Sequence, residues 1–167
     1  MIMQKNAIKI LITGGTIDDI EYSDEKDAPK DHPSLIPSLL KQARVTTNIQ
    51  FEILMHKDSK FVTETDRELI LQKCRETSKE SIIITHGTVT MIDTAQFLLK
   101  ANLQKTIVLL GASIPANRKN SDALFNLGSA ITAAQLLDRG VYITMNGKVL
   151  PANHAKKNPI KDCFEEA

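Results

Sequence analysis

The sequence predicts an α/β domain in three layers, a mainly parallel sheet with helices on both faces. Short runs of branched apolar residues recur along the chain, segments with helical spacing lie between them, and most of the runs end at glycine or hydroxyl residues. Strands that alternate with helices in this way form parallel sheets, because each helix returns the chain to the starting edge of the sheet.

The N-terminal part of the chain predicts a buried strand, a loop and a short helix. Ala7 to Thr13 is rich in branched apolar residues and stops at Gly14-Gly15, which suits a strand that is buried on both faces. Asp18 to Pro33 is acidic and lacks periodicity, so we expect a mobile loop. Helical spacing begins at Ser34, with Pro37 tolerated in the first turn.

A second strand and a longer helix follow. Phe51 to Met55 is expected as a strand that ends in the polar turn His56 to Lys60. Thr65 and Glu68 have the spacing of a capping box, so a helix is expected from there to about Ser78.

The alternation continues with two strands and two helices. Ser81 to Thr85 is expected as the third strand, and a helix begins near Met91. Thr106 to Leu110 is the fourth strand. Ser121 to Leu137 is a long helix whose first two residues, a serine and an aspartate, suit its N-terminus.

The last expected elements form a hairpin. Val141 to Met145 is the fifth strand, and Asn146-Gly147 is a strong two-residue turn signal. Lys148 to Leu150 is expected to return as a short partner strand. A length of 167 residues is within the usual range for one domain, so the chain is expected to form a single domain spanning residues 1–167, and 42% hydrophobic residues is typical of a globular protein.

Net charge, hydropathy and cysteine content indicate which binding partners and which cellular compartment to expect. The formal net charge of +1 provides no field that would attract nucleic acid. No apolar run approaches the roughly 20 residues that a membrane span needs. Cys74 and Cys163 are far apart and belong to no disulfide framework, which fits a reduced cytoplasmic protein.

Hydroxyl residues follow three of the predicted strands. Thr13 and Thr16 follow the first strand, Ser59 follows the second, and Thr85 and Thr88 follow the third. Because the carboxyl ends of parallel strands meet at one edge of a sheet, these loops are expected to converge on one polar pocket. The pocket should bind a small molecule.

Two threonine motifs give the chain a family resemblance. Thr13-Gly14-Gly15-Thr16-Ile17, together with Thr85-His86-Gly87-Thr88-Val89-Thr90-Met91, resembles the two signature motifs of the L-asparaginase family. The segments His56 to Lys60, Leu110 to Pro115 and Gly140 to Lys157 extend the resemblance along most of the chain. The resemblance implies a Rossmann- or flavodoxin-like fold and amide hydrolysis without a cofactor.

The resemblance also implies roles for individual residues. Thr16 would be the acylated nucleophile, and Thr88 with Lys157 would be the second hydroxyl and its base, because an unactivated hydroxyl is a poor nucleophile. Tyr22 would match a mobile tyrosine that assists the nucleophile. The substrate-binding positions would be Ser59, Asp58, Gly15 and Gly87, with Ser59 holding the carboxylate end of the substrate.

The chain departs from the family at Val89, where the family has an aspartate. By resemblance, that aspartate binds the α-ammonium of the substrate and completes an arrangement of threonine, lysine and carboxylate. Valine can do neither, so we expect poor action on asparagine itself. The family usually has a further C-terminal domain, and we therefore expect a homodimer or larger homo-oligomer to cover the exposed surfaces.

Three functions are compatible with these features. The leading one is an amidohydrolase acting through Thr16 on a small amide or amino-acid-like ligand, and the alternative is a noncatalytic ligand-binding or interaction domain that keeps the fold. A phosphate or nucleotide binder is a third, weakened by the lack of a P-loop. No metal site is expected, because His32, His56, His86 and His154 lack paired ligand spacing.

Overall fold

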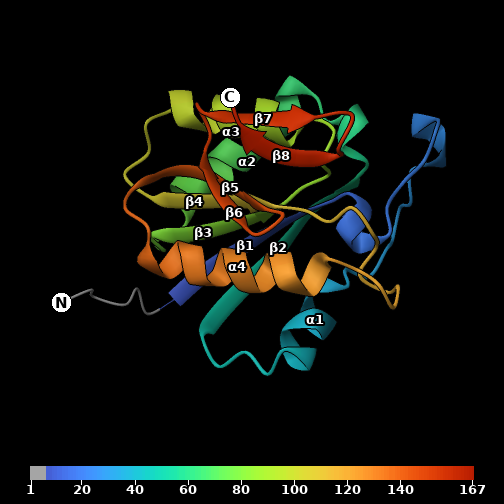
Figure 1. The fold of residues 1–167 in the computed structure, drawn as a ribbon, viewed down its shortest axis with the longest axis horizontal. Coiled ribbons are helices and arrows are strands. Elements are labelled where there is room, and N and C mark those ends of the chain that lie inside the picture. Colours follow the sequence, from blue (N-terminus) through green and yellow to red (C-terminus); the bar gives the residue numbers. More distant parts are fainter. Residues whose placement is uncertain (1–6) are drawn as a thin grey trace.

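The computed structural model describes residues 7–167, which form a six-stranded sheet with helices on both faces (Figure 1). The strands are β1 (Ala7–Gly14), β2 (Asn48–Lys57), β3 (Ser81–Thr85), β4 (Thr106–Leu110), β5 (Gly140–Met145) and β6 (Lys148–Pro151). Their order is β2-β1-β3-β4-β5-β6, and only β6 runs antiparallel to its neighbour in this sheet. The predicted α/β class and mainly parallel sheet are confirmed.

Two helices cover each face of the sheet. These are α1 (Ile36–Gln42), α2 (Glu64–Glu76), α3 (Met91–Lys100) and α4 (Ala123–Leu136). Helices α2 and α3 lie on one face and α1 and α4 on the other (Figure 1). Successive side chains of a strand point to opposite faces, so Ile82 and Ile84 pack with the α2 and α3 layer while Ile83 packs with the α1 and α4 layer. This explains why the strands are continuous apolar runs.

The direction of chain winding reverses between β1 and β3. Strand β2 lies on one side of β1, whereas β3, β4 and β5 follow in order on the other side. The two central strands are tied together at their carboxyl ends: Thr13 Oγ1 donates to the Thr85 carbonyl oxygen at 2.6 Å. In open α/β sheets such a reversal point is where loops diverge and ligands bind.

Two hairpins complete the C-terminal part. Asn146 and Gly147 both have positive φ, 54° and 75°, and the predicted tight turn between β5 and β6 is confirmed. A second hairpin of β7 (Ala155–Asn158) and β8 (Cys163–Glu166) was not predicted. Lys157 lies in β7 of this hairpin. Phe164 of β8 is 1% exposed and packs into the α2 and α3 layer, which fixes this hairpin to the domain.

The segment between β2 and α2 differs from the prediction. Strand β2 extends through Lys57, so His56 and Lys57 are strand residues and the predicted polar turn begins only at Asp58. The capping box consists of Thr63 and Asp66, and not of Thr65 and Glu68. The Asp66 carboxylate accepts from Thr63 N at 2.8 Å and from Lys57 Nζ at 2.7 Å, so this box also ties the helix to β2.

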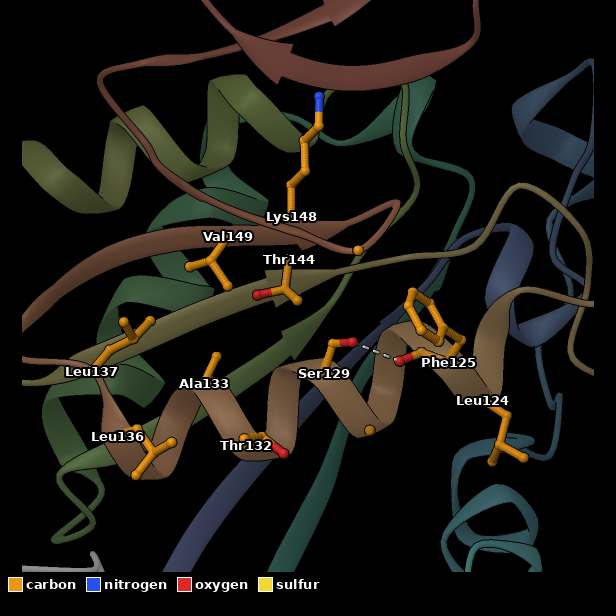
Figure 2. A pocket seen from close by; sticks show the side chains of 12 residues that line it. Leu124, Phe125, Ser129, Thr132, Ala133, Leu136, Leu137, Thr144, Lys148 and Val149 are labelled. Carbon is orange, nitrogen blue, oxygen red and sulfur yellow. Dashed lines mark hydrogen bonds between the residues drawn. The ribbon is translucent and has the colours of Figure 1, made fainter. Parts of the chain in front are cut away.

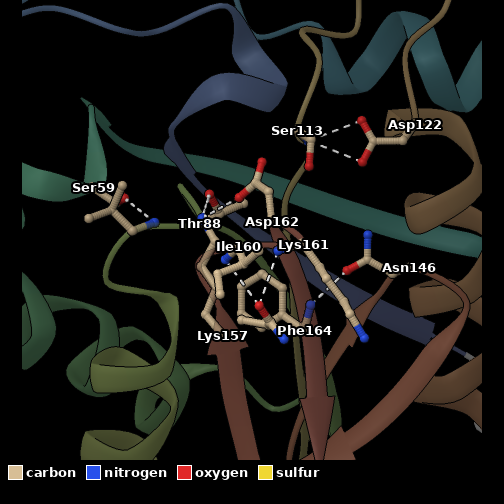
Figure 3. Close-up of polar contacts among 12 residues, drawn as sticks. Ser59, Thr88, Ser113, Asp122, Asn146, Lys157, Ile160, Lys161, Asp162 and Phe164 are labelled. Atoms are coloured by element: carbon tan, nitrogen blue, oxygen red, sulfur yellow. Dashed lines mark hydrogen bonds and ion pairs between the residues drawn. The ribbon is translucent and has the colours of Figure 1, made fainter.

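The starts of α1 and α4 are both displaced by local side-chain contacts. Helix α1 begins at Ile36 because Ser34 Oγ accepts from Ile36 N instead of lying within the helix. Helix α4 begins at Ala123, whose N–H donates to Ser121 Oγ at 3.0 Å. The Asp122 carboxylate accepts from Ser113 N, so it fastens the loop after β4 rather than capping the helix (Figure 3).

The acidic segment after β1 is irregular, as expected, apart from two short 3₁₀ turns, η1 (Thr16–Asp18) and η2 (Glu25–Asp27). Asp18 is buried, and its carboxylate accepts from Leu35 N at 2.8 Å. Burial raises the pKa of this carboxyl group. Asp18 thus ties the residues after the first strand to the start of α1.

Candidate active site

A cavity of about 70 Å³ lies at the carboxyl edge of β1, β2 and β3. It is lined by residues of three loops: Gly15, Thr16, Glu21, Asp58, Ser59, Lys60, Gly87, Thr88 and Val89. Most of these residues were predicted from the sequence to have a role or to mark a departure from the family, and Glu21 was missed. The structure therefore brings Thr16, Ser59 and Thr88 to one cavity.

Two glycines allow the first and third loops to approach each other. Gly15 has φ 81°, and a Cβ added to it would lie 2.5 Å from the Cα of Gly87. A Cβ added to Gly87 would lie 2.5 Å from Ser59 Oγ. Only a residue without a side chain fits at either position without displacing its neighbour. The Gly15–Gly87 contact places the loop of Thr16 directly against the loop of Thr88.

Ser59 joins the second loop to the third. It lies in η3 (Ser59–Phe61), it is 2% exposed, and its Oγ accepts from Val89 N at 3.2 Å. Its carbonyl oxygen accepts from Thr90 Oγ1 at 2.6 Å. Because the hydroxyl accepts one hydrogen bond, its own proton stays available to a ligand in the cavity.

Asp58 and Lys60 form an ion pair beside Ser59, with 3.1 Å between Lys60 Nζ and Asp58 Oδ2. The same carboxylate accepts from Lys60 N at 3.1 Å. Asp58 is 7% exposed, so this pair is part of the cavity wall. The lining beside Ser59 thus contains an ammonium group and a carboxylate that neutralise each other.

Thr88 is the point where the cavity meets the C-terminal hairpin. Lys157 Nζ of β7 donates to Thr88 Oγ1 at 3.1 Å (Figure 3). The same nitrogen lies 3.0 Å from Asp162 Oδ1. The hydroxyl of a residue that lines the cavity thus contacts an amine, and the amine contacts a carboxylate.

Tyr22 does not lie in the cavity lining, although it was expected to assist Thr16. Its ring stacks on Phe61 with 5.0 Å between ring centroids, and the side chain is 9% exposed. Its hydroxyl is buried and has no partner among the described residues. The neighbouring Glu21 lines the cavity instead. No pattern in the sequence distinguished Glu21 from the other acidic residues of its segment.

Val89 lies at the rim of the cavity and is 63% exposed. An exposed valine supplies neither charge nor a side-chain hydrogen bond at the position after Thr88. Its backbone N–H donates to Ser59 Oγ and is therefore already paired. The rim here therefore offers only an apolar surface to a ligand.

His86 is buried behind the cavity and is held on both sides. Its Nδ1 lies 2.8 Å from the Gly87 carbonyl oxygen, and its Nε2 lies 2.9 Å from Thr94 Oγ1. Burial lowers the pKa of His86 to about 4, so the ring is neutral at pH 7. With Nδ1 donating to Gly87, Nε2 accepts from Thr94 and the ring supports the third loop.

A larger groove of about 620 Å³ lies between α4 and the β5–β6 hairpin (Figure 2). It shares no lining residue with the small cavity. Its wall is mainly apolar, with Phe125, Leu136 and Val149 exposed by 62%, 54% and 44%. Size alone would favour this groove as the active site. The small cavity is the better candidate because hydroxyl, amine and carboxylate groups gather around it.

Residues 7–167 give no sign of a metal centre or a membrane span. In that part of the chain, no group of three or more His, Cys, Asp or Glu residues is placed to hold a metal ion. Among the same residues, no helix is both long and apolar enough to cross a membrane.

The structure is an α/β domain with a hydroxyl-lined cavity at the winding reversal of its parallel sheet, which is where ligands bind in open α/β sheets. Comparison with known proteins narrows this class. A family model described as the N-terminal domain of asparaginase matches residues 7–165, and the chain therefore belongs to the asparaginase family.

Individual relatives agree with the family assignment. The chain is 34% identical over 161 residues to a probable periplasmic L-asparaginase of Haemophilus influenzae, which is 90% of this chain and 46% of that protein. It is 30% identical over 165 residues to a glutaminase-asparaginase of Pseudomonas aeruginosa, covering 90% of this chain and 45% of that protein.

A solved structure agrees as well. The thermostable L-asparaginase of Thermococcus kodakarensis superimposes with a TM-score of 0.80 at 26% identity, over 96% of this chain and 51% of that one. The chain thus spans about half of the length of these proteins.

Proposed function

We propose that the chain is an amidohydrolase that cleaves a small carboxylate-bearing amide, with the hydroxyl of Thr16 as nucleophile. The supporting observation is that Thr16 and Thr88, from different loops, line the same cavity while Lys157 Nζ contacts Thr88 Oγ1. Amide attack by a hydroxyl needs a base and donors nearby, and this cavity has both kinds of group.

The proposed reaction has two steps. Thr16 Oγ1 attacks the amide carbon, the hydroxyl proton is transferred to the amide nitrogen, and the C–N bond breaks so that ammonia leaves and an ester on Thr16 remains. Water then attacks the ester carbon, the carboxylic acid leaves, and the Thr16 hydroxyl is restored. Thr88 and Lys157 assist by accepting and returning the proton, which general acid–base groups do at a gain of about 10²–10⁴ in rate.

The carboxylate end of the substrate is proposed to bind at Ser59. The proton of its hydroxyl is available, and the ammonium group of Lys60, which is paired with Asp58, belongs to the same cavity lining. Gly15 and Gly87 are proposed to contact the substrate from the cavity lining, where they let the three loops pack closely together. Val89 offers no partner for an ammonium group, so an amide without one is favoured over asparagine.

A catalytic role for Tyr22 requires a rearrangement of the residues after η1, because its ring packs on Phe61 outside the cavity lining. Tyr22→Phe distinguishes a catalytic role of the hydroxyl from a packing role of the ring. If the hydroxyl assists Thr16, ammonia release falls; if the ring only packs, ammonia release is unchanged.

Ammonia release from a panel of small amides, including succinamate and asparagine, tests the proposed function. Thr16→Ala should abolish the release. Thr65→Ala is the matched control, because Thr65 is an exposed threonine of α2 that lines neither the cavity nor the groove beside α4. Release that survives the Thr16 substitution would exclude this mechanism.

The rival function is a noncatalytic ligand-binding or interaction domain, and Val89 is the observation that favours it. A domain that has lost a charged substrate contact can keep its pocket without turnover. In that case a ligand such as succinate would raise the unfolding temperature, while no amide in the panel would yield ammonia.

Self-association is part of the proposal. The groove between α4 and the β5–β6 hairpin exposes Phe125, Leu136 and Val149 (Figure 2), and β6 is an edge strand of the six-stranded sheet. Exposed apolar surface of this kind is commonly buried between subunits. We propose a homodimer or larger homo-oligomer that covers this groove.

A cytoplasmic location is likewise proposed. Cys74 and Cys163 are both free, as expected in a reducing compartment. Burial raises the pKa of the Cys74 thiol to about 12, so this thiol stays protonated and is no competitor of Thr16 as nucleophile. Fractionation of cells followed by detection of the protein tests the location.

A further inference from the structure

Three side chains form a line of contacts that leads away from the cavity. Thr88 Oγ1 accepts from Lys157 Nζ at 3.1 Å, and Lys157 Nζ lies 3.0 Å from Asp162 Oδ1 (Figure 3). Lys157 is in β7, and Asp162 ends the turn that leads into β8. The cavity hydroxyl is thus connected to a carboxylate through one amine.

The turn that carries Asp162 is held in a defined shape. Asn158 Oδ1 accepts from Ile160 N and from Lys161 N, both at 3.0 Å. Asp162 has φ 44°, a left-handed conformation that aspartate and asparagine tolerate better than most residues. Shortly after it, Phe164 N donates to Asn146 Oδ1 at 2.9 Å. These hydrogen bonds hold the backbone before and after Asp162 in place.

We propose that Asp162 is a positioning residue that holds Lys157 Nζ against Thr88 Oγ1. A lysine side chain is flexible and loses its orientation easily, so a second contact at Nζ is needed to keep it on one hydroxyl. Val89, the residue after Thr88, has no charge that could hold the Lys157 amine. Asp162, in the turn between β7 and β8, supplies a carboxylate to that amine instead. The inference rests on the proposed function, in which Lys157 assists Thr88.

The solvent exposure of the Lys157–Asp162 ion pair indicates whether its loss will affect folding stability or reaction rate. The Asp162 side chain is 67% exposed and that of Lys157 is 27% exposed. Exposed ion pairs contribute little to folding stability. Loss of the Asp162 charge should therefore change the rate of the reaction and leave the unfolding temperature nearly unchanged.

The test is Asp162→Asn, which removes the charge but keeps the side-chain shape and the left-handed backbone. Its kcat for the best amide should fall about tenfold or more, because a small misplacement of an assisting group has a large effect on rate. Its KM should be unchanged, since Asp162 does not line the cavity. Asp162→Glu should restore part of the rate.

Lys156→Ala is the matched control. Lys156 forms an ion pair with Glu165 at 3.7 Å in the same hairpin, and this pair does not contact Thr88. This variant should keep the full kcat. Equal losses of kcat in D162N and K156A would overturn the proposal, because the effect would then belong to the hairpin as a whole.

A second measurement is independent of turnover. Competitive acetylation of the folded protein, followed by peptide mass spectrometry, reports how free each lysine amine is. D162N should raise the labelling of Lys157 several-fold and leave that of Lys156 unchanged. Unchanged labelling of Lys157 would overturn the proposal. If no variant releases ammonia, the proposed function fails, and the labelling alone decides whether Asp162 holds Lys157.

Discussion

Lys157 Nζ lies 3.1 Å from Thr88 Oγ1, although 69 positions separate the two residues in the sequence. The contact joins the loop after β3 to a strand of the C-terminal hairpin. It links a residue of the cavity lining to an amine, and the proposed acid–base chemistry depends on this contact.

Replacing Lys157 by methionine tests this contact. Methionine keeps much of the length and apolar surface of the stem but cannot accept or return a proton. Ammonia release should fall at least about 100-fold, the lower range for loss of a general acid–base group. Lys156→Met serves as the control on the same strand, and a K157M enzyme as fast as K156M would show that the amine has no part in the reaction.

Restoring a carboxylate at residue 89 should change ligand preference. Val89→Asp places a charge at the cavity rim, where an ammonium group of a ligand would gain a charge-assisted hydrogen bond of about 1.5–3 kcal/mol. Calorimetric titration should show L-aspartate binding about ten times more tightly or better, with succinate not improved. Val89→Asn separates charge from shape. Equal gains for both ligands would contradict the expected geometry of the rim.

His86 should make the domain sensitive to acid. Its pKa is about 4 in the folded protein, below the ordinary value of 6.5, so the unfolded chain binds more protons between these values. Stability is therefore retained above pH 6.5 and declines as pH falls towards 4, by up to about 3 kcal/mol from this residue.

Urea unfolding of wild type and His86→Asn between pH 7 and pH 4 measures that contribution. Asparagine can keep the donation to the Gly87 carbonyl but does not titrate. The variant should be less stable than wild type at pH 7, and the difference should shrink at pH 4. Parallel curves for the two proteins would mean that His86 does not titrate in this way.

A charge placed in the groove beside α4 should disrupt self-association. Phe125 is 62% exposed there, so Phe125→Glu removes apolar contact area and introduces repulsion between copies without disturbing the core. Light scattering should show an oligomer for wild type and a monomer for the variant. Lys148→Glu also changes charge in the groove wall but removes no apolar group, and it should have a smaller effect. An oligomer unaffected by F125E would place the interface elsewhere.

The sequence was sufficient for the sheet because burial on both faces leaves a clear pattern. Ile82, Ile83 and Ile84 mark a strand without ambiguity, and Asn146-Gly147 marks a turn that needs two positive φ values. The capping box was placed two residues too late. Thr63 and Thr65 are both followed three residues later by an acidic residue, so both fit a capping box. The contact of Asp66 with Lys57, which belongs to the observed box, cannot be inferred from the sequence.

The candidate site was predictable only where glycine and hydroxyl motifs end strands. The contacts that close the site come from tertiary structure. The β7–β8 hairpin has polar residues such as Lys156 and Lys157 on a two-stranded ribbon, without the apolar run that signals a strand. Glu21 and Tyr22 are adjacent in sequence, and which of them faces the cavity depends on the stacking of Tyr22 on Phe61.

The most direct measurement of the central claim is acid quenching during turnover, followed by peptide mass spectrometry. The account predicts an ester on the peptide that contains Thr16, sensitive to hydroxylamine and missing in Thr16→Ala. Ammonia release without any such ester, or an ester on a peptide that lacks Thr16, would contradict it.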